Sequence, residues 1–240
     1  MGYVVGMVGR DRGAAHCCTK GRRPVIPLAA SEAFERAFVP PARRSPEQRL
    51  ATTNLDHVTA RRQQILDIAA ELFAARGFHG VSVVELGAAC GITGPALYKH
   101  FSSKDAMLAE MLISISETLL HEGRARAARA ETAREAVDAL VEWHIEFALA
   151  HRALIVVQDR DWSSLPEDAR ERVRSLQRAY VDAWAIQLRR LDRTMSPETA
   201  RAAAHVVFGL INSTPHSGLL PDDEMHDLLR TMALGALSLR

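Results

Sequence analysis

The chain is poor in cysteine and in aromatic residues. It has three cysteines in 240 residues, Cys17, Cys18 and Cys90. Because the count is odd and two of them are adjacent, they form no disulfide framework, and this usage is typical of a reducing cytosol. Aromatic residues make up only 5% of the chain, whereas alanine, leucine and arginine recur throughout, which favours helices over sheets.

Long apolar runs and a large excess of one charge are also absent. No run of about 18 apolar residues occurs, so we expect no membrane-spanning segment. The first residues lack the charged-then-apolar layout of a secretion signal, and a cytoplasmic protein is therefore predicted. The formal net charge is +1, so the chain as a whole is not a polybasic nucleic-acid binder. Any nucleic-acid surface must come from local patterning.

Motifs of catalysis and metal binding are absent as well. The sequence contains no G-x-S-x-G, no P-loop, no H-E-x-x-H and no C-x2-C pattern. His144 and His151 share a predicted helix face, but no cysteine or carboxylate accompanies them at metal-ligand spacing. We predict no catalytic residue, no metal site and no cofactor, and hence no enzyme.

Residues 1–57 differ from the rest of the chain. They hold five of the ten prolines, more basic than acidic residues and no long amphipathic segment, so we expect a disordered basic extension. One interpretation is a dispensable extension or a misassigned start of translation. The other is an arm whose Arg43, Arg44 and Arg49 reach along DNA, as homeodomain arms do.

Helical spacing of apolar residues begins at Thr59. The pattern predicts one helix that ends at Gly77, where glycine can adopt the left-handed conformation. Ser82 and Glu85 then form the capping box of a second, short helix that ends at Gly91. A third helix follows at once, and two short helices joined by a tight turn are typical of a helix-turn-helix unit.

The third helix offers a surface for DNA. Thr93 is its expected cap, Pro95 lies in its first turn, and Leu97 and Phe101 anchor it from behind. Its opposite face is slim, and such a helix can enter the major groove, which is about 12 Å wide. Lys104, at the start of the next helix, is expected to anchor a phosphate. The predicted DNA-binding residues are Ser82, Thr93, Gly94, Pro95, Ala96, Tyr98, Lys99, His100 and Lys104.

This stretch resembles the TetR family of bacterial repressors. The similarity covers roughly Thr59 to Leu112 and centres on "GITGPALYKHFSSK". It implies a homodimer whose three-helix unit, residues 58–104, binds palindromic operators, and a larger helical domain, residues 105–240, that binds an effector and dimerises. Leu86 and Gly87 stand where the family has isoleucine and alanine, and the glycine predicts a looser second helix.

The remaining residues predict further helices and no strand. We expect helices at about 103–121, 133–150, 164–191, 196–212 and 221–237, a short helix in "RALIVVQDRDW", and a break at Gly123. The predicted fold is all-α, with about nine helices. The last two helices contain "ARAAAHVVFGLI" and "LLRTMALGALSL". Because they are apolar on more than one face, they predict a dimer contact, with core helices as the alternative.

Aromatic and polar side chains of the second domain share helix faces. An apolar pocket with a few convergent polar groups is typical of a ligand site, although a core with satisfied histidines explains the same pattern. The predicted lining residues are Trp143, His144, Phe147, Trp162, Tyr180 and Trp184, with Phe208, Asn212 and His216 closing the pocket from the partner side.

A looser similarity concerns the nature of the effector. Parts of the second domain resemble a subgroup of the family that controls lipid and acyl-CoA metabolism. This resemblance implies a fatty acyl-CoA or a similar lipophilic effector. Arg174 and Arg178 then either meet its phosphates or form an ordinary solvated face.

Two functions are open at this point. The first is a ligand-responsive transcriptional regulator, a repressor released from a palindromic operator by a small lipophilic effector; an activator fits the same sequence. The second is a helical small-molecule-binding or enzymatic bundle in which the helix-turn-helix serves only as packing. Tyr98 and Lys99 favour the first, because a packing helix presents apolar residues at such positions.

Overall fold

The computed structural model describes residues 46–237, with side chains described from residue 59 onward. Over this range the chain forms nine α-helices and two 3-10 helices and no strand, which confirms the predicted all-α fold. Their bounds are α1 Pro46–Arg76, α2 Val83–Ala89, α3 Gly94–Leu97, α4 Lys104–Arg129, α5 Ala133–Ala150, α6 Arg152–Asp161, η1 Trp162–Ser164, α7 Glu167–Leu191, α8 Pro197–Ile211, η2 Thr214–His216 and α9 Asp222–Ala236.

Helix α1 ends where the sequence predicts and begins earlier. Gly77 has a φ of 83°, the left-handed conformation that stops the helix. Phe78 then folds back, and its ring meets that of Phe73 edge to face at 5.2 Å between centroids. The helix begins at Pro46, inside the segment expected to be an extension. The expectations for residues 1–45, including the arm at Arg43 and Arg44, lie outside the described residues.

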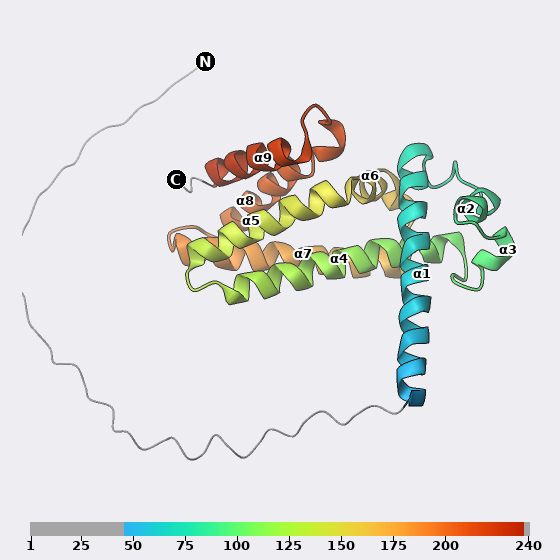
Figure 1. The fold of residues 1–240 in the computed structure, drawn as a ribbon. Helices are drawn as coiled ribbons and strands as arrows, with labels where there is room; N and C mark the ends of the chain where they lie inside the picture. The colour runs from blue at the N-terminus through green and yellow to red at the C-terminus, as the bar shows by residue number, and fades with distance from the viewer. Residues whose placement is uncertain (1–45, 238–240) are drawn as a thin grey trace, which may run out of the picture. The chain divides into compact units, whose positions relative to one another are not determined.

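Helix α4 passes through the predicted break at Gly123. It runs without interruption from Lys104 to Arg129. Gly123 is a close-packing residue instead, because a Cβ at this position would lie 2.6 Å from the ring of Tyr180 on α7. The glycine lets α4, α5 and α7 approach one another, and Figure 1 shows these three helices running side by side.

Two hydrophobic cores hold these helices together. One joins α4, α5, α7, α8 and α9, with Ile155 from α6. The other contains the buried faces of α1–α3 and the start of α4, together with Val157, Leu165, Ala169 and Val173 from α6, the segment after η1 and the start of α7. The second core therefore crosses the boundary expected near residue 104, and the three-helix unit does not pack as a separate body.

Helix α6 also binds the end of α1 through hydrogen bonds. The Arg160 guanidinium donates to the backbone oxygen of Ala74 at 3.1 Å and to that of Phe73. These carbonyls belong to the last turn of α1, where helix carbonyls run short of amide partners, although the Phe73 oxygen also accepts from the Gly77 N–H at 2.7 Å. Ser164 and His79 add a hydrogen bond of 2.9 Å between Oγ and Nε2. Residues of the second domain and of the three-helix unit are thus joined by polar as well as apolar contacts.

Candidate functional sites

Helix α2 begins with the predicted capping box. The backbone N–H of Glu85 donates to Ser82 Oγ at 3.2 Å, and the backbone N–H of Ser82 donates to the Glu85 carboxylate at 2.8 Å. The Ser82 hydroxyl also donates to the Glu85 carboxylate at 2.7 Å. This bond, followed by those from the Ser82 N–H and from Arg76, lowers the pKa of Glu85 to about 2. Ser82 is therefore occupied in starting the helix, and any contact that it makes with DNA is additional to that role.

The turn between α2 and α3 is packed tightly, and the expectation of a loose second helix is wrong. A Cβ on Gly87 would lie 2.7 Å from the Gly94 nitrogen and 2.9 Å from the Ile92 oxygen. The absence of a side chain at Gly87 therefore allows the turn to pack directly against α2. Gly91 has the left-handed φ of 67° that the turn requires. Gly94 was predicted to contact DNA, but it is buried against α2. It is therefore a packing residue, and its surface is not available to DNA.

Helix α3 has a buried back and an exposed front, as the sequence predicts. Thr93 caps it, with its Oγ1 accepting from the Ala96 N–H at 3.3 Å. Leu97 and Phe101 are each only 3% exposed. On the other side Tyr98 is 54% exposed, and the side chains of Thr93, Pro95 and Lys99 are also exposed, while those of Ala96 and His100 are half-buried. We call Thr93, Pro95, Tyr98 and Lys99 the α3 front.

The prediction of Lys104 as a phosphate anchor requires its side chain to point freely outward, and it does not. Its ammonium group donates to the backbone oxygens of Phe78 and Val81, at 2.9 and 3.0 Å, and lies 4.3 Å from the centre of the Phe78 ring. These carbonyls satisfy much of its hydrogen-bonding capacity. Lys104 therefore fastens the start of α4 to the loop between α1 and α2.

Arg62 is a positioning residue that sequence reasoning missed. Its guanidinium binds the Glu110 carboxylate on α4 and the backbone oxygen of His100 at the end of the α3 region. It also lies 4.2 Å from the centre of the Phe101 ring. One side chain thus holds α1, α4 and the residues after α3. No local pattern indicates this, because its partners are 38 and 48 residues away along the chain.

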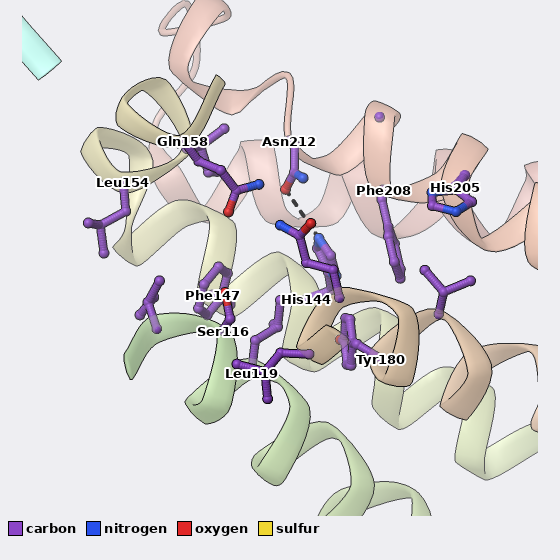
Figure 2. A pocket seen from close by; sticks show the side chains of 16 residues that line it. Ser116, Leu119, His144, Phe147, Leu154, Gln158, Tyr180, His205, Phe208 and Asn212 are labelled. Atoms are coloured by element: carbon purple, nitrogen blue, oxygen red, sulfur yellow. Dashed lines mark hydrogen bonds between the residues drawn. The ribbon is translucent and has the colours of Figure 1, made fainter. Parts of the chain in front are cut away.

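A cavity of about 300 Å³ lies among α4–α8 of the second domain. Figure 2 shows its sixteen lining side chains, with His144 in their midst and Asn212 bonded to it. They are Ile115, Ser116, Leu119, His144, Phe147, Leu154, Ile155, Gln158, Leu176, Gln177, Tyr180, Val181, His205, Phe208, Gly209 and Asn212.

Half of the predicted pocket residues line this cavity. His144, Phe147 and Tyr180 do, and Phe208 and Asn212 join them from the same chain instead of closing the pocket from a partner. His216 is not among the lining residues. No sequence pattern indicated Ser116, Gln158 or Gln177, because isolated polar residues on helices are common on solvent-facing surfaces.

The three tryptophans lie elsewhere, which corrects their prediction as lining residues. Trp184 is fully buried in the core next to the cavity. The Trp143 indole donates to the Leu119 oxygen at 3.0 Å, with Arg126 over its ring. Trp162 belongs to η1 and packs against the core of the three-helix unit. Large aromatic rings fill helix interfaces well, and here that packing role prevails over lining the cavity.

The pKa of His144 is strongly shifted by its burial in the cavity lining. It is 2% exposed and stacks on Phe208, with ring centroids 4.5 Å apart. Its Nε2 lies 3.1 Å from Asn212 Oδ1. Burial lowers the pKa of His144 to about 4, against the smaller opposing effect of that hydrogen bond. The imidazole is therefore neutral at physiological pH.

A second, shallower groove of about 360 Å³ adjoins the cavity and shares Gln177, Val181 and His205 with it. Its remaining lining residues are Arg174, Arg178, Asp182 and Arg201. The arginines are already ion-paired: Arg174 and Arg178 with Glu171, and Arg201 with Asp182. The positive charges of the three groove arginines are consequently largely neutralised by these carboxylates.

The described part of the chain has neither a metal-binding cluster nor a helix that could cross a membrane. No cluster of three or more His, Cys, Asp or Glu side chains there has metal-binding geometry. Within the same residues, no helix combines the length and the apolar character needed to cross a membrane.

Two short helices joined by a tight glycine turn define a helix-turn-helix protein. Residues 65–111 match the family described as bacterial regulatory proteins, tetR family, and residues 130–237 match the domain described as tetracyclin repressor-like, C-terminal. The chain belongs to the TetR family. Its members are DNA-binding regulators and not enzymes, in agreement with the prediction of no enzymatic activity.

Individual relatives agree with this assignment. The chain is 36% identical over 102 residues to the HTH-type transcriptional repressor KstR2 of Rhodococcus jostii, which covers 42% of this chain and 50% of that protein. It spans about half the length of the curated relatives it matches. A TetR-family regulator from Bordetella parapertussis has a TM-score of 0.65 at 26% identity, covering 72% of this chain and 93% of that one. AibR, solved with isovaleryl coenzyme A and operator DNA, has a TM-score of 0.62 at 21% identity, covering 72% and 97%.

Proposed function

We propose that this protein is a cytoplasmic transcriptional repressor that binds a palindromic operator as a homodimer and is released by a small lipophilic effector. The single observation that carries the proposal is the α3 front, which stands exposed over a fully buried back. A helix used only for packing would bury Tyr98 and Lys99. The alternative of a bundle with a purely structural helix-turn-helix leaves their exposure without a reason.

The proposed DNA contacts divide into reading and positioning. Thr93, Pro95 and Lys99 present small or cationic groups to base edges, while Tyr98 and the half-buried His100 are placed to meet phosphates. Ala96 adds a methyl group to the reading side. Lys104 is left out of this set, because its ammonium is bound to two carbonyl oxygens.

Helices α8 and α9 are the proposed dimer surface. Val206 on α8 is 65% exposed and Met232 on α9 is 49% exposed, and Leu228 is exposed beside them on α9. Covering these apolar side chains with the same surface of a second copy produces a twofold dimer. Such a dimer can place its two α3 helices one DNA turn apart, about 34–36 Å, which makes the operator an inverted repeat.

A fatty acyl-CoA is the proposed effector. The cavity is mostly apolar and opens beside the arginine-bearing groove, and the structurally similar AibR was solved with isovaleryl coenzyme A. Because the groove arginines are ion-paired, an anionic head group would have to displace Glu171 or Asp182 from them. We expect octanoyl-CoA to release the protein from operator DNA, and free coenzyme A not to; equal effects of the two would reject an acyl-binding cavity.

Helix α6 offers a path from effector to DNA. Leu154, Ile155 and Gln158 of this helix line the cavity, while Val157 and Arg160 contact the three-helix unit. An effector that favours a different position of α6 would change the placement of α3. Its influence is limited by its differential affinity for the two arrangements.

Replacement of Lys99 tests the proposed DNA contact directly. The purified protein first selects its own binding fragment from a random duplex library. We expect Lys99→Ala to weaken binding to this fragment by roughly 1–3 kcal/mol if the lysine reads guanine. Fluorescence anisotropy at fixed salt measures the change. Arg190→Ala is the matched control, because it removes one positive charge from an exposed site on α7. Equal affinities of the two variants would contradict the role of Lys99.

A further inference from the structure

The cavity of the second domain is lined without any formal charge. None of its sixteen lining residues, all of which lie in the described part of the chain, is Asp, Glu, Lys or Arg. Its two histidines include His144, which burial keeps neutral. A carboxylate or ammonium group placed inside would lose its hydration without gaining an opposite charge, and that loss is large in an apolar site.

Charges around the cavity are already neutralised by their own partners. Arg126, whose charge acts on Tyr180, is ion-paired with Glu146 at 2.8 Å. In the adjoining groove, Arg178 pairs with Glu171 at 2.5 Å and Arg201 with Asp182 at 2.8 Å. A charged ligand group would therefore have to break an existing pair in order to be compensated. An uncharged ligand body encounters no such penalty.

Two lining residues nevertheless have unsatisfied hydrogen-bonding atoms. The Nδ1 atom of His144 and the hydroxyl of Tyr180 are buried and make no hydrogen bond. Because the Asn212 oxygen can only accept, the His144 Nε2 carries the proton that binds it, and Nδ1 is left with a lone pair. Burial raises the pKa of Tyr180, and the nearby Trp184 indole has a smaller, opposite effect on it. The Tyr180 hydroxyl nevertheless makes no hydrogen bond to that indole.

Leaving such atoms unpaired is costly, and most buried polar atoms in folded proteins have a partner. The lone pair of His144 Nδ1 needs a donor, whereas the Tyr180 hydroxyl can donate or accept. The two rings stack with centroids 5.7 Å apart, so both belong to one region of the lining. A hydroxyl is a small uncharged group that can donate to one and accept from the other.

We propose that the part of the effector held in this cavity is an uncharged, largely apolar molecule that carries a hydroxyl group hydrogen-bonded to His144. The inference rests on the proposed effector-binding function and narrows its ligand class. It distinguishes a neutral alcohol from a free carboxylic acid and from an amine, both of which are charged at neutral pH. A fatty acyl group fits this class when it is held as an uncharged thioester with a hydroxyl on its chain.

Four probes of equal chain length test the inference on the full-length protein. They are octan-1-ol, octanoate, octylammonium and 1-chlorooctane, titrated at pH 7.5 by calorimetry. We expect octan-1-ol to bind at least tenfold more tightly than either charged probe. It should also bind about fivefold more tightly than 1-chlorooctane, the difference expected for one hydrogen bond. Octanoate or octylammonium binding as tightly as the alcohol would overturn the proposal, and so would failure of all four to bind.

Variants assign the hydroxyl contact to its residue. His144→Phe should remove the preference for octan-1-ol over 1-chlorooctane while both still bind, and Ser116→Leu, which fills part of the cavity, should weaken both. His121→Phe is the matched control, since His121 is exposed on α4 and does not line the cavity. A His144→Phe protein that keeps the full preference would reject the assigned contact. Operator binding is measured separately, so its loss would refute the proposed repressor and not the ligand class.

Discussion

Replacing Leu97 by alanine is expected to abolish operator binding and to lower the free energy of unfolding by about 2–5 kcal/mol. Leu97 is 3% exposed and packs in the core shared by α1–α4 and the start of α7. Helix α3 is only four residues long, so it has too few hydrogen bonds to persist without this anchor. Urea unfolding followed by circular dichroism measures the stability, and anisotropy with the selected duplex measures binding.

The control for this substitution is Ile186→Ala, which truncates an exposed aliphatic side chain on α7. We expect it to change stability by no more than about 0.5 kcal/mol. Helix α3 can also unfold locally without global unfolding. In that case Leu97→Ala would lose operator binding at a smaller cost in stability. Retention of wild-type operator affinity by Leu97→Ala would show that the packing of α3 does not position the α3 front.

Stability is expected to fall as the pH is lowered from about 7 to about 4, with His144 contributing about 3 kcal/mol of the loss. Burial holds the pKa of His144 at about 4 in the folded protein, below the ordinary value of 6.5. Between these values the unfolded chain binds the proton and the folded chain does not. Protonation therefore favours the unfolded chain, and the stability present above pH 6.5 decreases on acidification.

The difference between wild type and His144→Phe isolates this effect from other titrating groups. The variant lacks the titrating ring, so its stability should change less across the same pH range. Free energies of unfolding at pH 7, 5.5 and 4.5 give the comparison. Parallel curves for the two proteins would mean that His144 does not titrate abnormally and that its burial is less complete than the structure indicates.

Local features were largely predictable from the sequence. Caps and turns depend on neighbouring residues, so the capping box at Ser82, the cap at Thr93 and the left-handed glycines at Gly77 and Gly91 are all confirmed. The bounds of α5 were also predicted correctly, and the structure adds a capping box of Thr132 and Glu135 at its start. Apolar spacing likewise identified Leu97 as the buried anchor of α3.

Contacts between distant segments were not predictable. Lys104 looked like an exposed cation, yet two carbonyls more than twenty residues away receive its hydrogen bonds. Gly123 looked like a break, because the sequence cannot show that the ring of Tyr180 needs the space where a Cβ would lie. The tryptophans were assigned to a pocket by residue type, whereas the helix crossings place them in the packing around it.

The all-helical fold, the helix-turn-helix and the side of α3 that faces outward follow from local sequence patterns, since periodicity and capping act within one turn of a helix. Three properties depend on the packing of the helices: which polar groups surround the cavity, that their formal charges cancel or are absent, and that α6 joins the cavity to the three-helix unit. These properties depend on how helices far apart in the chain cross one another, and neither spacing nor composition records those crossings.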